Sequence, residues 1–341
     1  MSQIIIEGPF FEDFKRGDII ESAPSITLTE GHAVAHQQLF GDRLRLPLDH
    51  VLCEKVTGSK QVLANPSMVI NMAIGQSTYA TQNVIGNLFY RGLVLKQPVY
   101  LGDTLYTTTS VALLKQNKPK ASRPASGLVV LEIRVLNQLD EELLHFWRCP
   151  MIPCRDQSVV TGYADDLGSI SSDISLASLL DAVPSYWNLK CYRTIFNGLH
   201  FNELNVGTSF LIKARDTVTC APELARLSLN LAMAHTDATK SVYGKRLVYG
   251  GHTISMAAAQ ILRALPNLMT ILAWRYCDHL APVFENDILH TELFIDDKTA
   301  LPTTGGIVEV RAKVFAERQT DTNLQACSEQ VLDWGLVILM A

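Results

Sequence analysis

The order of polar and apolar positions along the chain occurs twice. Each half opens with aromatic and acidic residues that lead to a glycine, at residues 11–17 and again at residues 201–207. Small and polar residues that favour a helix follow, at residues 30–39 in the first half and at residues 223–233 in the second. Because a repeated order of elements indicates repeated structural units, we predict two similar domains. A chain of 341 residues is also long enough for two hydrophobic cores.

An apolar helix is predicted next in each half. In the first half it spans residues 65–80, where Asn65 is the N-cap and Pro66 occupies the first helical position. In the second half it spans residues 251–265 and is rich in alanine, isoleucine and leucine. A helix that is apolar on nearly all faces must be buried on most of them, so each half needs a sheet around its helix.

Alternating apolar and polar residues after each helix predict that sheet. The expected strands are residues 105–114, 127–137 and 143–150 in the first half and residues 290–295, 306–318 and 326–339 in the second. Short turns between successive strands imply antiparallel pairing. One long buried helix inside a curled antiparallel sheet is the hot-dog architecture. We therefore predict an α+β fold, a tandem or double hot-dog, whose two copies form an intramolecular pseudo-dimer.

A stretch rich in serine, aspartate and glycine separates the two halves. We interpret residues 156–190 as a linker that carries at most a short helix. The expected domains are then an N-terminal hot-dog domain at residues 1–155 and a C-terminal hot-dog domain at residues 191–341.

Composition excludes several classes of function. The formal net charge of −5 argues against a nucleic-acid protein, because neutralising phosphates requires an excess of lysine and arginine. The first residues lack the pattern of a signal peptide, and no run of about 18 apolar residues occurs, so we expect a cytoplasmic protein without a membrane partner. The 7 cysteines lie singly and the histidines are not at zinc spacing. We therefore expect reduced thiols and no metal.

Two loops that precede the apolar helices carry the residues of chemical interest. In the second half, Asn230 is followed by His235 and Asp237. In the first half, Asp42 opens the corresponding loop, but Pro47 takes the place that the histidine has in the second. These loops resemble the Gly-Asp-x-Asn-Pro-x-His-x-Asp loop of the MaoC-like family of R-specific enoyl-CoA hydratases and hydroxyacyl thioester dehydratases. The asparagine at the start of the second loop is similar to that of mesaconyl-CoA hydratases.

The resemblance implies a hydro-lyase that adds water reversibly to a 2-enoyl-CoA, with the site in the second half. His235 is the expected general base, because imidazole titrates near neutral pH. Asn230 is expected to hold the water through its amide, although it cannot exchange a proton. Gly250 and Gly251 begin the second apolar helix, and its unpaired first amides are expected to bind the thioester oxygen. Tyr249 stands where the family usually has a histidine. No metal or redox cofactor is expected.

A basic hairpin at residues 115–127 is the densest group of cations in this acidic chain. Related mesaconyl-CoA hydratases carry a similar hairpin at this place, so Lys118, Lys120 and Arg123 are expected to bind the phosphates of CoA. A merely solvated hairpin is an equal alternative. His252 and His279 lie outside the motif and receive no role.

Two further functions stay open. Hot-dog thioesterases usually need an acidic residue on the central helix, and neither predicted helix has one. An inactive acyl-CoA-binding or scaffolding protein also fits, since the first half lacks the histidine and the second lacks the usual aspartate. An acyl-CoA or acyl carrier protein thioester is the expected substrate, and a homo-oligomer, such as a dimer, is the expected assembly.

Overall fold

The computed structural model describes residues 3–20, 23–118, 123–320 and 323–341. The first half contains strands β1 Ile19–Ile20, β2 Ile26–Thr27, β3 Gly86–Leu95, β4 Thr104–Gln116, β5 Ser126–Leu136 and β6 Glu142–Pro153. The second half contains strands β7 Ser209–Leu211, β8 Asp216–Thr217, β9 Leu268–His279, β10 Ile288–Ala300, β11 Gly306–Thr320 and β12 Asn323–Met340. The six strands that alternation predicted are confirmed as β4, β5, β6, β10, β11 and β12.

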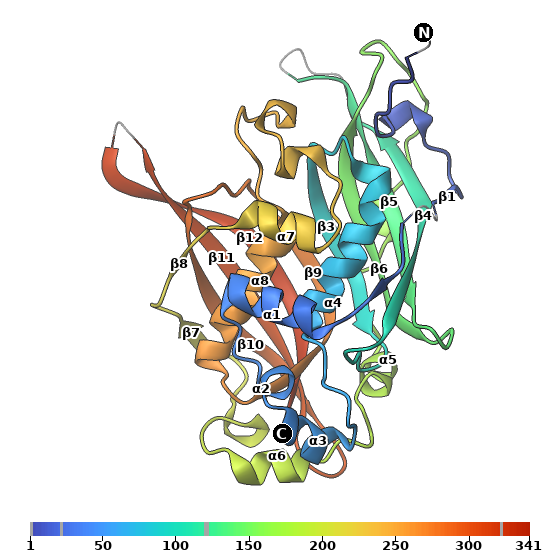
Figure 1. Cartoon of the computed structure of the whole chain (residues 1–341). Coiled ribbons are helices and arrows are strands. Elements are labelled where there is room, and N and C mark those ends of the chain that lie inside the picture. The colour runs from blue at the N-terminus through green and yellow to red at the C-terminus, as the bar shows by residue number, and fades with distance from the viewer. Residues whose placement is uncertain (1–2, 21–22, 119–122, 321–322) are drawn as a thin grey trace.

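These strands form a 12-stranded antiparallel sheet that runs through both halves (Figure 1). Its order is β1-β4-β5-β6-β3-β9-β12-β11-β10-β7, with β2 beside β4 and β8 beside β10. The halves join where β3 pairs with β9, with Tyr90 opposite Cys277 and Leu93 opposite Trp274. The sheet of one half thus continues into that of the other.

Two buried helices lie against the sheet, one from each half (Figure 1). Helix α4 spans Pro66–Gln76 and continues as the 3-10 helix η2, Ser77–Thr81, while α8 spans Gly250–Ala264. Asn65 caps α4 by accepting a hydrogen bond from the backbone N–H of Ser67 at 2.9 Å. Both predicted central helices are confirmed. The helices touch each other, and Asn71 donates from Nδ2 to Oγ of Ser255 at 2.8 Å.

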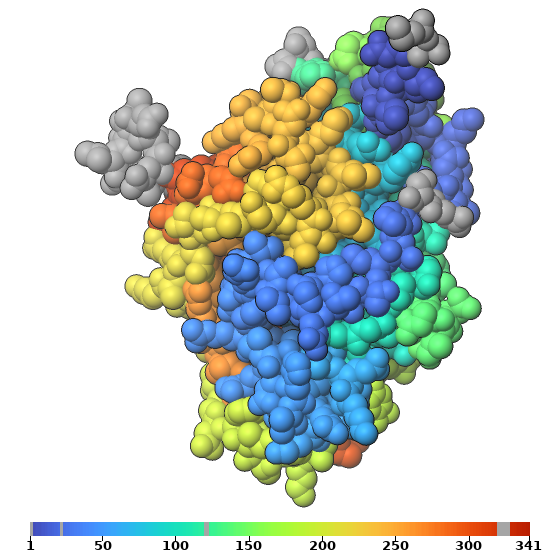
Figure 2. All heavy atoms as spheres, in the orientation of Figure 1, coloured from blue at the N-terminus to red at the C-terminus, as the bar shows by residue number. Residues whose placement is uncertain are grey.

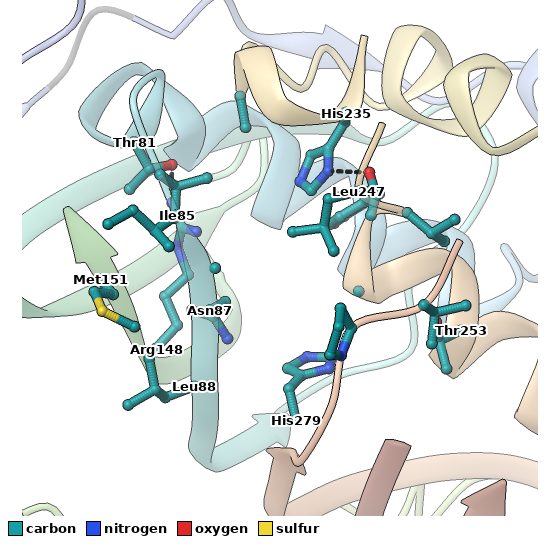
Figure 3. Close-up of a pocket in the computed structure, with 18 of the residues that line it drawn as sticks. Thr81, Ile85, Asn87, Leu88, Arg148, Met151, His235, Leu247, Thr253 and His279 are labelled. Carbon is teal, nitrogen blue, oxygen red and sulfur yellow. Dashed lines mark hydrogen bonds between the residues drawn. The ribbon is translucent and has the colours of Figure 1, made fainter. Parts of the chain in front are cut away.

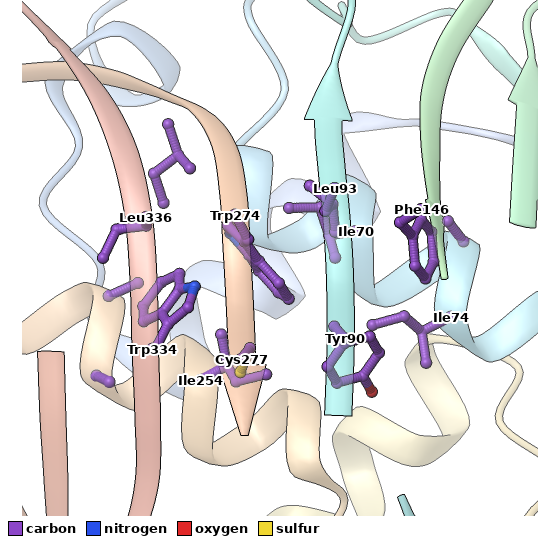
Figure 4. Close-up of a cluster of buried hydrophobic side chains, with 14 of the residues drawn as sticks. Ile70, Ile74, Tyr90, Leu93, Phe146, Ile254, Trp274, Cys277, Trp334 and Leu336 are labelled. Atoms are coloured by element: carbon purple, nitrogen blue, oxygen red, sulfur yellow. The ribbon is translucent and has the colours of Figure 1, made fainter. Parts of the chain in front are cut away.

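The core is shared across the junction between the halves. The ring of Trp274 on β9 meets Tyr90 of β3 edge-on, with ring centroids 5.8 Å apart, and Trp334 of β12 at 5.2 Å. Figure 4 shows these rings beside Phe146 of the first half and Ile254 of α8. Burial of such large rings stabilises a fold strongly, and because these rings come from both halves, the halves share one core here.

The segment between the halves packs on the sheet. It contains the 3-10 helix η3, Leu167–Ser169, and α5, Leu176–Asp181, and leads into α6, Leu189–Ile195. Leu179 and Trp187 are buried against Val337 and Leu339 of β12. Successive side chains of a strand point to opposite faces of the sheet, so the residues next to these two in β12 point to the other face. The proposed domain boundaries stay a prediction, but residues 156–190 contribute to burial of the sheet.

The remaining helices cover the edges of this core. Helix α1 is Glu30–Phe40, which confirms the prediction for residues 30–39, and it is followed by α2, Arg45–Leu48, and α3, His50–Thr57. The helix predicted for residues 223–233 is wrong in its second part, since α7 ends at Leu227. The chain then turns through Leu229, whose φ is 59°, and forms the short 3-10 helix η5, Met233–His235.

A close contact with α4 explains where that segment bends. A Cβ atom at Gly75 would lie 1.6 Å from the carbonyl oxygen of Ser228, so the helix needs glycine at this point. Leu231 donates its backbone N–H to Oγ1 of Thr78, and Met233 donates to the carbonyl of Gln82. Figure 2 shows the segment near residues 230–250 lying directly against the first half. These contacts override the helical tendency of the local sequence.

Candidate active site

A cavity of about 250 Å³ lies where the two halves meet. Its walls come from the end of α4 and η2, from β3 and β6, and from the loop before α8 together with the start of that helix and the end of β9 (Figure 3). The polar side chains and glycines in these walls include Thr78, Thr81, Tyr90, Arg148, Asn230, His235, Tyr249, Gly250 and His279. The cavity therefore draws on both halves, although the sequence placed its chemistry in the second.

His235, at the end of η5, is only 8% exposed and its ring faces the cavity (Figure 3). Its Nδ1 lies 2.8 Å from the carbonyl oxygen of Leu247. A carbonyl only accepts, so Nδ1 carries the proton and Nε2 has a free lone pair. Burial lowers the pKa of His235 to about 4. The imidazole is therefore neutral at pH 7.

Asn230 also lines the cavity and is 8% exposed. Its Oδ1 accepts the backbone N–H of Ala232 at 2.9 Å, so only the Nδ2 group is left to donate to a ligand. Asp237 has a different role, because it is exposed and caps the 3-10 helix η6, Ala238–Lys240, through Thr239. The structure thus brings Asn230 and His235 together and leaves Asp237 outside the cavity.

The two glycines occupy the first turn of α8, where backbone N–H groups lack intrahelical partners. Gly250 lines the cavity, whereas Gly251 is absent from its wall. Close packing also requires both: a Cβ at Gly250 would lie 2.5 Å from the imidazole of His279, and one at Gly251 would lie 2.0 Å from Oδ1 of Asn71. The amide of Gly250 is therefore the better placed of the two for a ligand oxygen.

Three polar residues of the cavity received no role from the sequence. Arg148 lies on β6, Tyr249 is the N-cap of α8, and His279 ends β9. The atoms Nε of Arg148, Oη of Tyr249 and Nε2 of His279 are all buried without a hydrogen-bond partner among the described residues. Burial, and then the nearby His235, lowers the pKa of His279 to about 4. An arginine inside the apolar strand of residues 143–150 was the signal that could have found this group.

The loop of the first half faces a different space. Asp42 is 3% exposed, and its Oδ1 accepts the backbone N–H of Leu44 at 2.8 Å, in the same way that Asn230 accepts from Ala232. The adjoining cavity is only about 10 Å³ and is lined mainly by apolar side chains such as Leu262. Asp42 and His235 line separate cavities, and only the second has room for a ligand.

The basic hairpin lies at the end of the sheet near the cavity. Lys118 and Arg123 are exposed, while Lys120 falls outside the described residues. The strand register sets Met151 of the cavity wall opposite Leu128, next to the hairpin. The hairpin begins at the end of β4, which lies three strand spacings, roughly 14 Å, from β3 in the sheet.

No group of three or more His, Cys, Asp or Glu side chains that could hold a metal ion occurs among the residues that the structure describes. None of the helices in the described part of the chain is long and apolar enough to cross a membrane.

Known proteins resemble this chain in sequence and in fold. No protein-family model matches the chain. β-Methylmalyl-CoA dehydratase from Chloroflexus aurantiacus is 28% identical over 328 residues, which cover 91% of this chain and 88% of the relative. Mesaconyl-CoA hydratase from Cereibacter sphaeroides is 28% identical over 307 residues, which cover 88% of this chain and 87% of the relative.

Solved structures extend the likeness to the fold. A conserved hypothetical protein from Mycobacterium tuberculosis with a double hot-dog fold is 42% identical, with a TM-score of 0.90 over 98% of this chain and 99% of that one. A protein from Chloroflexus aurantiacus described as a MaoC domain dehydratase is 27% identical, with a TM-score of 0.80 over 99% of each chain. The predicted double hot-dog fold is therefore confirmed.

Proposed function

Because the chain belongs to the MaoC-like dehydratase family and has a double hot-dog fold, we propose that it hydrates a 2-enoyl-CoA reversibly. The reverse reaction dehydrates a 3-hydroxyacyl-CoA. The named relatives are hydro-lyases that act on CoA thioesters. The observation that carries the proposal is His235, whose neutral imidazole presents a free Nε2 to a cavity.

In the proposed reaction, Nε2 of His235 removes a proton from water while the water oxygen bonds to C3 of the enoyl group. The C2–C3 π electrons move toward the thioester carbonyl and form an enolate, which the N–H of Gly250 and the positive end of α8 stabilise. The imidazolium then gives its proton to C2. Since burial disfavours the charged imidazole, the imidazolium gives up its proton in this second step more readily than an exposed imidazolium would.

Asn230 positions the water in this proposal. Its Oδ1 is fixed by the backbone of Ala232, so the Nδ2 group donates to the water oxygen. The amide cannot take up a proton, and His235 therefore carries the proton in both steps. Lys118, Lys120 and Arg123 would bind the phosphates of CoA. No cofactor enters this scheme, and assembly as a homo-oligomer stays a prediction.

A thioesterase reaction has less support. Such an enzyme needs a carboxylate near the thioester, and the described residues that line the cavity include neither Asp nor Glu. An inactive acyl-CoA-binding protein would have no need for the free Nε2 of His235 in the cavity.

A hydration assay tests the proposal. Loss of the enoyl-thioester absorbance should occur with wild-type protein and a short 2-enoyl-CoA, without release of free CoA. Release of CoA would instead favour the thioesterase, and tight binding without either change would favour the acyl-CoA-binding protein.

A further inference from the structure

His279 lies beside the N-terminus of α8, although the proposed reaction gives it no role. It ends β9, and it faces the same cavity as His235 (Figure 3). Its imidazole packs against Gly250, because a Cβ atom at Gly250 would lie 2.5 Å from Cε1 of the ring and 2.8 Å from Nε2. The ring therefore adjoins the place where the first turn of α8 would meet a thioester oxygen.

The imidazole and the helix N-terminus both offer a hydrogen-bonding nitrogen to a ligand. The first backbone N–H groups of a helix lack intrahelical acceptors, and the N-cap Tyr249 provides no side-chain cap for them. Nε2 of His279 is buried and also has no hydrogen-bond partner among the described residues. Leaving a buried polar nitrogen unpaired is costly, so a ligand atom that accepted from both groups would be held firmly.

The spacing of these two nitrogens fits one shared acceptor. Standard bond geometry places the amide nitrogen of a residue about 2.5 Å from its Cβ. Since Nε2 lies 2.8 Å from the Cβ position of Gly250, the two nitrogens are at most about 5.3 Å apart. An oxygen that accepts hydrogen bonds of about 2.9 Å from two donors can bridge donors up to about 5.8 Å apart. One thioester oxygen, which has two lone pairs, can therefore contact both.

The ring of His279 is neutral and fixed in place. Burial, and then the nearby His235, lowers the pKa of His279 to about 4, so the imidazole is uncharged at pH 7. Strand pairing sets His279 opposite Leu332 of β12, and the ring meets Tyr90 edge-on with centroids 5.8 Å apart. A neutral imidazole keeps its one N–H proton near pH 7, but through it the ring can polarise a carbonyl. Donors that are fixed before the reaction need no reorganisation when charge develops.

We propose that Nε2–H of His279 and the N–H of Gly250 together bind the thioester oxygen, so that His279 is a second catalytic residue beside His235. As water adds to C3 and the C2–C3 π electrons move toward the carbonyl, the growing negative charge on that oxygen strengthens both hydrogen bonds. His279 keeps its proton throughout, and His235 alone transfers protons. This inference rests on the proposed function for the reaction, but the hydrogen bond to a bound thioester can be measured without turnover.

Butyryl-CoA labelled with carbon-13 at the thioester carbonyl is the probe for this hydrogen bond, because its saturated chain cannot be hydrated. Infrared difference spectra should show its C=O stretch at a lower frequency on wild-type protein than on His279→Leu, since the leucine removes one donor. His279→Gln places an amide N–H near the position of Nε2 and should restore part of the shift. Equal frequencies on wild type and His279→Leu would overturn the inference. If wild-type protein does not bind butyryl-CoA, the acyl-CoA function fails and this inference fails with it.

Turnover then tests the catalytic part of the inference. His279→Leu should lower kcat for crotonyl-CoA, a short 2-enoyl-CoA, by about 10²- to 10³-fold, the usual effect of losing one oxyanion donor. Its KM should stay within a small factor of wild type. His279→Gln should lose clearly less, and equal losses in both variants would overturn the catalytic role and show that the ring only packs between Tyr90 and Gly250.

His36→Leu is the matched control. It removes another buried imidazole whose Nε2 lacks a partner among the described residues, but whose ring lines a different cavity. Its kcat and its carbonyl frequency should match those of wild type. If wild-type protein binds butyryl-CoA with the lowered frequency but does not hydrate crotonyl-CoA, the proposed reaction fails while the hydrogen bond from His279 stands.

Discussion

The fold determines the protonation state of His235 through two local features. The carbonyl of Leu247 fixes the proton on Nδ1, and burial keeps the ring neutral. Removing the imidazole should therefore remove general-base catalysis, which is worth about 10²- to 10⁴-fold. We predict a loss of at least that size in kcat for His235→Ala, measured by the hydration assay, with the circular dichroism spectrum unchanged.

Asp42→Asn provides the control for that variant. The amide keeps the Oδ1 acceptor that holds the backbone of Leu44, just as Asn230 holds Ala232 in the other half. Because Asp42 adjoins a separate cavity that is too small for a ligand, we expect its replacement to leave kcat within a small factor of wild type. Loss of activity in Asp42→Asn, with normal turnover in His235→Ala, would show that the reaction takes place in the first half and not in the second.

A second prediction concerns the acid limb of the pH profile. Only a neutral His235 could act as the proposed base, and its pKa of about 4 means that kcat should fall only as the pH drops toward 4. Asn230→Asp adds a negative charge beside the imidazole, which stabilises the imidazolium and raises that pKa. The acid limb should then move to higher pH. An unchanged profile of kcat against pH would show that Asn230 does not face His235 in the working enzyme.

How far residues could be predicted depended on their place in the chain. His235 and Asn230 belong to one loop, so the resemblance of their spacing to the family's loop predicted a shared site. Arg148 and His279 come from strands in different halves, and only the pairing of β3 with both β6 and β9 brings them to one cavity. Spacing along a single sequence contains no direct signal for such a meeting.

At the level of whole elements, Gly75 allows the loop that leads to Asn230 and His235 to approach α4. A Cβ atom there would collide with the carbonyl of Ser228 at 1.6 Å. Gly75→Ala should therefore displace the segment that leads to Asn230 and destabilise the protein by about 1–3 kcal/mol. Urea denaturation and kcat should both report the change.

Gly31→Ala is the matched control for that variant. Gly31 lies on α1, and the nearest atom to an added Cβ is Oγ1 of Thr29 at an ordinary 3.5 Å. Alanine is the better helix former by about 1 kcal/mol, so this variant should be neutral or more stable. Equal destabilisation by both substitutions would contradict the contact with Ser228.

The basic hairpin between β4 and β5 gives a prediction at the same scale. Charge reversal at Lys120 and Arg123, as Lys120→Glu with Arg123→Glu, should raise KM for a CoA substrate, because the phosphates would meet like charge. A pantetheine thioester has no such phosphates, so its KM should stay the same. An equal effect on both substrates would leave the hairpin without a role in CoA binding.

Elements were predictable wherever a local pattern agreed with burial. The central helices and the longer strands followed from apolar periodicity, since their faces are buried as the pattern implied. The helix expected at residues 223–233 was too long because contacts with Gly75 and Thr78, distant in sequence, bend the chain after α7. A short window of sequence cannot predict such contacts, because the residues that make them lie far apart in the chain.

At the scale of the whole molecule, burial keeps several histidines of the folded protein neutral. The pKa is lowered to about 4 in His235, His252 and His279 and to about 3 in His36, in each case first by burial. The unfolded chain should titrate these groups near the ordinary value of about 6.5. Between the two values the unfolded state binds more protons than the folded state, so stability falls as the pH is lowered through this window.

Each of these histidines should contribute a loss of up to about 1.4 kcal/mol per pH unit below 6.5, and this contribution should level off below the folded-state pKa. We predict that the free energy of unfolding, measured in urea at intervals from pH 7 to pH 5, decreases steadily. His36→Leu removes one titrating group that lies outside the cavity and should reduce this slope by about one proton. His50→Gln, at an exposed position, should leave the slope unchanged. The carboxylates contribute equally to the change of unfolding free energy with pH in both proteins, so their contribution cancels when the slopes are compared. If wild type and His36→Leu had the same slope, His36 would not be buried as a neutral ring.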